Sequence, residues 1–130
     1  MRPGARLAEA QHAAGGSVHT YVVTWRAAAA PRTLGACHAI ELPFVFGTGK
    51  SPLVRSLTGL GEDGYRLTQQ MQRSWVQFAR TGEPGHARLP SWPAFEPSSR
   101  PTMILGRRCE LAEAPLDPDR KLLARWHGEA

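Results

Sequence analysis

The stretch Leu34-Gly35-Ala36-Cys37-His38-Ala39-Ile40-Glu41-Leu42-Pro43-Phe44-Val45-Phe46-Gly47 is the most informative part of the chain. It places a histidine three residues before a glutamate, ahead of an apolar run that ends at a glycine. Imidazole has an ordinary pKa close to neutral pH, so His38 is a candidate general base. Such a base needs a nucleophile to deprotonate and a carboxylate to orient it, and neither is evident beside His38.

The segments around this stretch predict alternating strands and helices. Upstream, residues 6–14 predict the end of a helix, which Gly15-Gly16 terminates. Val18–Trp25 is dense in β-branched and aromatic residues and predicts a strand covered on both faces. Downstream, we expect Phe44-Val45-Phe46 to pack in the core at the base of the site, and residues 47–61 to form a loop.

The C-terminal half predicts a long amphipathic helix and one more strand. Residues 63–80 have helical periodicity, with four apolar residues on one face: Leu67, Met71, Trp75 and Phe78. Residues 100–105 predict a final strand, in which Pro101 is tolerable near the start. Asp117 followed by Pro118 is typical of a helix start. These elements together predict an α/β fold, with a few strands of a mainly parallel sheet and flanking helices.

Composition and charge exclude several classes of function. The chain has 130 residues, the size of one domain, and a formal net charge of +5. Its arginines are scattered from Arg2 to Arg125, as on a solvated surface, so we expect no nucleic-acid partner. No run of 18 apolar residues predicts a membrane span, and no signal peptide is visible. We therefore expect no membrane partner, and a cytoplasmic location if the chain is expressed as it stands.

The two cysteines, Cys37 and Cys109, do not form a disulfide framework, and we expect free, partly buried thiols. Cys37 adjoins His38, which suggests a cysteine nucleophile. Neighbouring side chains of an extended segment point to opposite sides, however, so this pair is badly placed for proton transfer.

An ordered set of segments resembles the carboxylesterase type-B family, which includes para-nitrobenzyl esterases and cholinesterases. The most specific is the stretch around His38, from the histidine to Gly47. The others, in the family's order, are Ala8–Gln11, Tyr21–Arg26, Met71–Pro84, Leu89–Pro93 and Arg100–Met103. The resemblance implies that residues 1–130 form the C-terminal part of an α/β-hydrolase domain.

The same resemblance implies that His38 is the histidine of a serine-esterase triad, which acts on small-molecule esters without a cofactor. The triad acid would lie upstream of Met1, and Glu41 would support the loop by hydrogen bonds, because a buried carboxylate must be paired. No serine of the chain stands in the Gly-x-Ser-x-Gly turn of these enzymes; Ser17 comes closest but lacks the second glycine. We therefore expect the isolated chain to be inactive and the missing N-terminal portion of the fold to be its partner. The alternative is a non-catalytic, adhesion-type or degenerate remnant of the same fold.

Two further sequence patterns are weaker indications of a binding site, one for phosphate and one for a metal ion. Gly47-Thr48-Gly49-Lys50-Ser51 is similar to the end of a phosphate-binding loop, but Phe44 stands where that loop needs a glycine, and Pro52 argues against the helix that must follow. His38 and Glu41 are metal-ligand residue types without a third ligand at a suitable spacing, so we expect no metal site.

Overall fold

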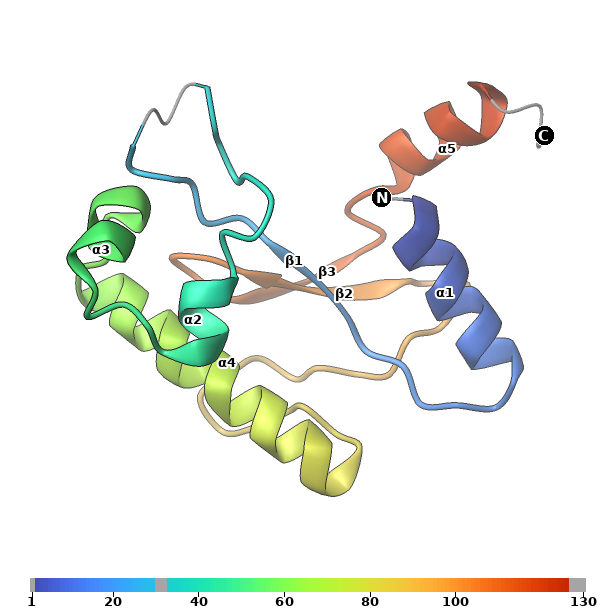
Figure 1. Ribbon diagram of the computed structural model, residues 1–130. Helices are drawn as coiled ribbons and strands as arrows, with labels where there is room; N and C mark the ends of the chain where they lie inside the picture. Colours follow the sequence, from blue (N-terminus) through green and yellow to red (C-terminus); the bar gives the residue numbers. More distant parts are fainter. Residues whose placement is uncertain (1, 30–32, 127–130) are drawn as a thin grey trace.

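Three strands form a mixed sheet at the centre of the computed structural model, which describes residues 2–29 and 33–126 (Figure 1). The strands are β1 (Thr20–Val23), β2 (Pro101–Leu105) and β3 (Glu110–Glu113), in the order β1-β2-β3. β1 runs parallel to β2 with Thr20 opposite Thr102, and β3 runs antiparallel to β2 with Leu111 opposite Met103. In Figure 1, helices α2 and α4 lie below the sheet and α3 to its left, whereas α1 and α5 lie to the right.

The strand and helix predicted before the His38 stretch are both present. The helix is α1 (Arg2–Ala13), which ends before Gly15, as predicted; the φ of Gly15 is 80°. The strand is shorter than predicted, with Thr20–Val23 in the ladder. The extended segment that contains Trp92 is hydrogen-bonded to this strand, because the indole N–H of Trp92 donates to the Thr20 carbonyl at 3.2 Å.

The long helix is α4 (Glu62–Thr81), as predicted, but one of the four residues that we expected on its buried face is exposed. Leu67 and Met71 are fully buried, and Trp75 packs against the same core. Phe78 is 43% exposed, because it lies one turn beyond the part of the helix that the sheet covers. The fully buried position next to Met71 is instead taken by Ser74.

The prediction of a loop over residues 47–61 is wrong, because α3 (Pro52–Thr58) lies within it. Pro52 is in the first turn of α3, where the missing N–H is not needed and the fixed φ suits a helix. A helix therefore does follow Ser51, contrary to our argument against phosphate binding. The absence of the required glycine still argues against a phosphate-binding loop, since Phe44, which stands in its place, is fully buried in the core.

The strand over residues 100–105 is present as β2, but it is not the final one. β3 follows after a short turn and pairs antiparallel with β2, so the sheet is less parallel than predicted. The sequence of β3, Glu110-Leu111-Ala112-Glu113, is short, mostly exposed and without alternation of apolar and polar residues, which explains why periodicity did not reveal it. The last helix, α5 (Asp117–Trp126), begins at Asp117, which we expected to be the N-cap, one residue before the predicted first helical residue, Pro118.

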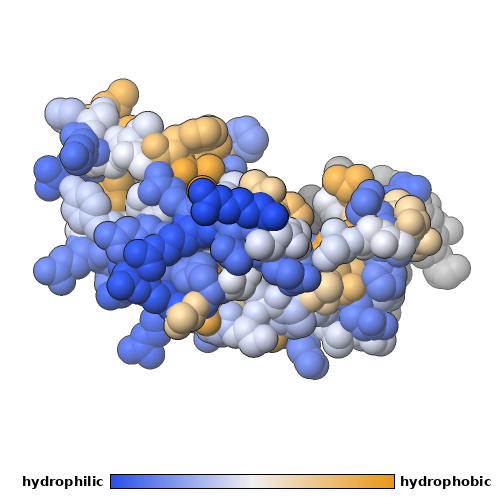
Figure 2. Space-filling model, turned by 90° about the horizontal axis from the view of Figure 1, so that it is seen from below, coloured by the Kyte–Doolittle hydropathy of each residue, from blue (hydrophilic) through white to orange (hydrophobic). Residues whose placement is uncertain are grey.

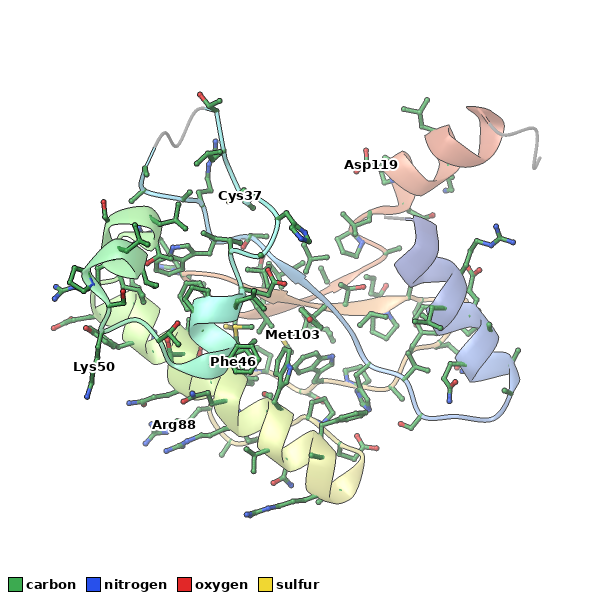
Figure 3. The ribbon with its side chains drawn as sticks, in the orientation of Figure 1. Cys37, Phe46, Lys50, Arg88, Met103 and Asp119 are labelled. Atoms are coloured by element: carbon green, nitrogen blue, oxygen red, sulfur yellow. The ribbon has the colours of Figure 1, made fainter. Side chains whose placement is uncertain are left out.

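One hydrophobic core joins the sheet to α2 and α4. Its buried residues are Trp25, Ala27, Ile40, Phe44, Leu60, Leu67, Met71, Trp92, Met103 and Leu105. Met103 lies at the centre of the side chains between the sheet and the helices in Figure 3. Since Ile40 and Phe44 are part of this core, the segment around His38 is attached to the most buried part of the molecule.

Candidate active-site loop

His38 lies in a tight turn between β1 and α2 (Leu42–Phe46). The N–H of Ile40 donates to the carbonyl of Cys37 at 3.2 Å, and the N–H of Leu42 donates to the carbonyl of Ala39 at 3.2 Å. Ala39, directly after the histidine, has a φ of 64°. A positive φ at the third residue of a four-residue turn is typical of type II turns, where glycine is the usual residue. The turn therefore fixes the backbone around His38 at a cost in backbone strain.

The imidazole of His38 is exposed, and within the described residues it makes no hydrogen bond or ion pair. The residues on either side are held: Cys37 packs against the core, and Ile40 is buried in it. The loop thus presents a histidine with both ring nitrogens available, on a backbone that the core anchors. This arrangement leaves room for both a nucleophile and an acid to bind the ring.

Glu41 supports the loop through its backbone. Its carbonyl accepts the N–H groups of Phe44 at 3.0 Å and Val45 at 3.1 Å, so Glu41 caps the start of α2. The expected side-chain hydrogen bond is not found among the described residues, and the carboxylate is half-buried rather than buried. The carboxylate of Glu41 acts electrostatically on Tyr21 of β1. The pKa of the Tyr21 phenol is raised mainly by burial and secondly by the negative charge of Glu41.

The aromatic residue Phe44 anchors α2 beneath the loop. It is fully buried, and its ring centroid lies 5.1 Å from that of Trp25, which follows β1. Phe46, which we also predicted to be in the core, is 69% exposed, because it lies on the outer face of α2, where Leu42 is exposed too. Figure 3 shows Phe46 on α2, beside α4.

A second histidine lies near a serine and a carboxylate, a grouping that the sequence motifs did not indicate. Nε2 of His19 is 3.4 Å from the Ser17 hydroxyl and 3.4 Å from a carboxylate oxygen of Glu83. A catalytic triad needs the serine and the acid on opposite ring nitrogens. Here both contact Nε2, while Nδ1 is buried without a partner in the described part of the chain. His19 is therefore placed for packing between Phe78 and Trp92, not for proton transfer.

Within the described residues, neither the two cysteines nor the acidic side chains form a further reactive site near His38. Cys37 and Cys109 are both free and half-buried. The Cys109 thiol donates to the side-chain carbonyl of Gln70 at 3.3 Å, and burial raises its pKa. In residues 2–29 and 33–126, no three histidine, cysteine or acidic side chains are grouped as metal ligands would be. In the same ranges, no helix combines the length and apolar character that crossing a membrane requires.

A cleft of about 950 Å³ lies on the α1 side of the sheet, away from His38. Its lining is mostly apolar and includes Leu7 and Ala8 of α1 and Thr20 and Val22 of β1. Arg100 at its border is already paired with Glu9 and Asp117. The cleft lacks His38, and the histidine that lines it, His19, has Ser17 and Glu83 on the same ring nitrogen. It is therefore not the site of the chemistry that His38 suggests.

Comparison with known proteins shows to which family the chain belongs. Residues 2–120 match the sequence profile of the carboxylesterase family. The chain is a member of this family. Phenmedipham hydrolase of Pseudarthrobacter oxydans is 39% identical over 93 residues, and para-nitrobenzyl esterase of Bacillus subtilis is 32% identical over 94 residues. These alignments cover 66% and 72% of this chain, but only 18% and 19% of the two enzymes.

Solved carboxylesterase structures share the arrangement of this chain. The carboxylesterase EST55 of Geobacillus stearothermophilus superposes with a TM-score of 0.75 at 32% identity, over 89% of this chain and 24% of that one. A PNB esterase superposes with a TM-score of 0.80 at 31% identity, over 92% of this chain and 24% of that one. The predicted α/β-hydrolase fold is therefore confirmed, and this carboxylesterase chain spans about a fifth of the length of the curated relatives.

Proposed function

We propose that residues 1–130 act as the C-terminal part of a serine carboxylesterase, in which His38 is the histidine of the catalytic triad. The observation that carries this proposal is the geometry of the loop. An exposed imidazole that has no partner among the described residues stands on a strained turn, whose flanking residues Cys37 and Ile40 contact the core. Membership of the carboxylesterase family supplies the reaction class, hydrolysis of carboxylic esters.

In this role His38 moves protons between the serine, the leaving group and water. One ring nitrogen accepts the proton of the serine hydroxyl as the serine attacks the ester carbonyl. The resulting imidazolium donates that proton to the leaving alcohol, and an acyl-serine remains. The imidazole then takes a proton from water as the water oxygen attacks the acyl carbon, and it returns that proton to the serine oxygen as the carboxylic acid leaves. The second ring nitrogen donates to a carboxylate, which fixes the tautomer.

Glu41 is a supporting residue in this proposal and not the acid of the triad. Its carbonyl caps α2, and its carboxylate acts on Tyr21, while the described residues show no hydrogen bond between Glu41 and the His38 ring. The nucleophile, the acid and the oxyanion donors would come from a separate, N-terminal portion of the same fold.

The test is complementation. The chain is fused behind, or co-expressed with, the remaining N-terminal portion of a related para-nitrobenzyl esterase, and hydrolysis of para-nitrophenyl acetate is measured. We expect activity that His38→Ala lowers by about 10⁴-fold or more, since loss of one triad member removes most of the catalysis. His12→Ala, which removes an imidazole on α1, and Cys37→Ala, next to the base, are the matched controls and should change the rate little.

Two outcomes would count against the assignment. Near-normal turnover in the His38→Ala fusion would show that another group is the base. A fusion that folds but hydrolyses no ester would favour the alternative, a non-catalytic member of the family that uses the fold for binding. Folding is checked independently by the far-ultraviolet circular dichroism of each fusion.

A further inference from the structure

The outward side of α4 carries a row of arginines that are far apart in the sequence. Arg66, Arg73 and Arg80 follow one another at intervals of seven residues, so they lie nearly in line along the helix, about 10.5 Å apart. Arg66 is paired with Asp63 in the first turn. Figure 2 views the molecule from below, which is the side of α4 in Figure 1, and shows strongly hydrophilic side chains, in dark blue, across the middle of this face. The helix thus aligns positive charges that the sequence scatters.

The two arginines in the C-terminal half of α4 have no negative charge near them. Arg73 and Arg80 are exposed, and neither forms an ion pair within the described residues. Residues 64–95 contain four arginines and one acidic residue, Glu83. The carboxylate of Glu83 is not available to these arginines, because it lies 3.4 Å from Nε2 of His19, which precedes β1. This part of the surface therefore has an excess of positive charge.

A groove of about 400 Å³ runs along α4 at these two arginines. One wall is the loop after the helix, in which Nδ1 of His86 accepts the N–H of Arg88 at 3.2 Å, while Nε2 donates to the carbonyl of Gln70 at 3.2 Å. These two hydrogen bonds hold the loop on the helix, so the groove is fixed without a ligand. Figure 3 shows Arg88 beside α4, on the side away from the sheet. The residues that line the groove are Gln72, Arg73, Val76, Gln77, Arg80 and His86.

The outward side of α4 has the character of a surface that stays exposed in a complete esterase. The apolar residues Leu67 and Met71 are already buried in the core, so α4 has its main packing contacts within this chain. Burying the guanidinium of Arg73 or Arg80 without a carboxylate opposite it would cost more free energy than the contact returns. The groove therefore differs from the apolar edge of β1, which the proposed N-terminal portion of the fold would cover.

We propose that this groove binds an acidic segment of a partner protein, a helix with two carboxylates seven residues apart and an apolar side chain between them. The planar guanidinium of arginine binds a carboxylate with two parallel hydrogen bonds, and the spacing of Arg73 and Arg80 sets the spacing of the two carboxylates. Between the two arginines lies Val76, which is 52% exposed and offers an apolar contact. A nucleic-acid backbone matches the charges but has no apolar group for Val76, so an acidic protein segment fits better.

The proposal is tested with a fluorescent, alanine-rich helical peptide that has two glutamates seven residues apart and a leucine between them. Fluorescence anisotropy should show saturable binding to the chain that weakens as salt is added, and no binding of the same peptide with glutamines in place of the glutamates. Arg73→Gln and Arg80→Gln should each weaken binding by about two- to fivefold, the range for exposed ion pairs. Arg55→Gln, which removes an exposed arginine from α3, is the matched control for net charge and should bind like the unmodified chain.

A charge exchange separates specific pairing from general attraction. The double variant Arg73→Glu/Arg80→Glu should reject the glutamate peptide and bind a peptide with lysines at the same two positions, while circular dichroism confirms that it folds. Failure of this exchange, or an equal loss in Arg55→Gln, would overturn the proposal, as would tighter binding of a single-stranded oligonucleotide than of the peptide. Binding should persist in the fusion with the N-terminal portion of a para-nitrobenzyl esterase, and its loss there would show that the fold itself covers the groove. His38→Ala should bind normally, so the result is independent of the proposed catalytic role.

Discussion

The carbonyl of Cys37 accepts the N–H of Ile40 at 3.2 Å, and this bond makes His38 and Ala39 the two central residues of one turn. Cys37 and Ile40 both contact the core, so the ends of the turn are fixed while His38 faces solvent. Ala39 has a φ of 64°, a conformation that costs about 1–2 kcal/mol for a residue with a Cβ. The position of the imidazole therefore depends on the strained backbone of its neighbour.

We predict effects of different size for two substitutions at Ala39. Ala39→Gly relieves the strain but adds freedom to the unfolded chain, so the free energy of unfolding should change by less than about 1 kcal/mol. Ala39→Val adds a branched side chain in the same conformation and should destabilise the protein by about 1–3 kcal/mol. Urea unfolding at a fixed protein concentration measures both. Equal stability of the valine and glycine variants would show that the turn relaxes freely.

The second prediction is that the isolated chain does not catalyse ester hydrolysis. No serine of the chain stands in a Gly-x-Ser-x-Gly turn, and the serine that contacts a histidine, Ser17, shares one ring nitrogen with Glu83. A complete enzyme that has lost one triad residue keeps about 10³–10⁴-fold catalysis from binding and its oxyanion hole. The sequence contains no pattern typical of the hydrogen-bond donors of an oxyanion hole. Para-nitrophenyl acetate should therefore be hydrolysed at the background rate. Saturable turnover that disappears in His38→Ala would refute this.

Local sequence signals predicted the elements with a clear apolar or capping pattern and missed short elements without one. The helix over residues 63–80 is α4, because apolar residues repeat with the helical period from Leu67 to Phe78, about three turns. Helix α3 has seven residues and begins at a proline, and β3 has four residues, of which two are glutamates. Such short elements have too few residues for a period to show, and tertiary contacts decide them. Trp25, for example, fixes α3 through a hydrogen bond that spans 33 residues.

The site could be predicted only in part for a similar reason. The motif indicated His38 and Glu41, and the structure places both on one turn before α2. Whether Glu41 would use its side chain or its carbonyl could not be read from residue type, because that depends on where the turn directs each group. The proximity of His19, Ser17 and Glu83 was missed, since Glu83 follows α4 and comes close only through the packing of α4 against β1.

The third prediction concerns the buried bond that holds α3 to the sheet. The indole N–H of Trp25 donates to the carbonyl of Thr58 at 2.7 Å, and Trp25 is almost fully buried. Trp25→Phe keeps most of the apolar contact with Phe44 but leaves the Thr58 carbonyl unpaired. That loss should lower the free energy of unfolding by about 1–3 kcal/mol. Thermal unfolding monitored by circular dichroism measures it, with Tyr65→Phe at an exposed ring as the control. An unchanged midpoint would mean that water replaces the indole.

The last prediction follows from Asp63 in the first turn of α4. Its carboxylate accepts from Arg107, 3.1 Å away in the turn between β2 and β3, and from Arg66 one turn along the helix. These hydrogen bonds, first that of Arg107 and then that of Arg66, hold the pKa of Asp63 below its ordinary value of 3.8. A carboxyl whose pKa is lowered by folding stabilises the folded state above its ordinary pKa, and the contribution is lost as the pH falls through the folded value.

Asp63→Asn should therefore lower the thermal midpoint at pH 7, and the difference from the unmodified chain should shrink as the pH falls below about 4. The effect should be small, because all three side chains are partly exposed to solvent. Glu62→Gln is the matched control: it removes a carboxylate from the same first turn, where no arginine partner is found among the described residues. Its difference from the unmodified chain should be smaller and should vary less between pH 7 and pH 3. A pH-independent loss in Asp63→Asn would show that the residue stabilises α4 by capping or packing, rather than through its two arginines.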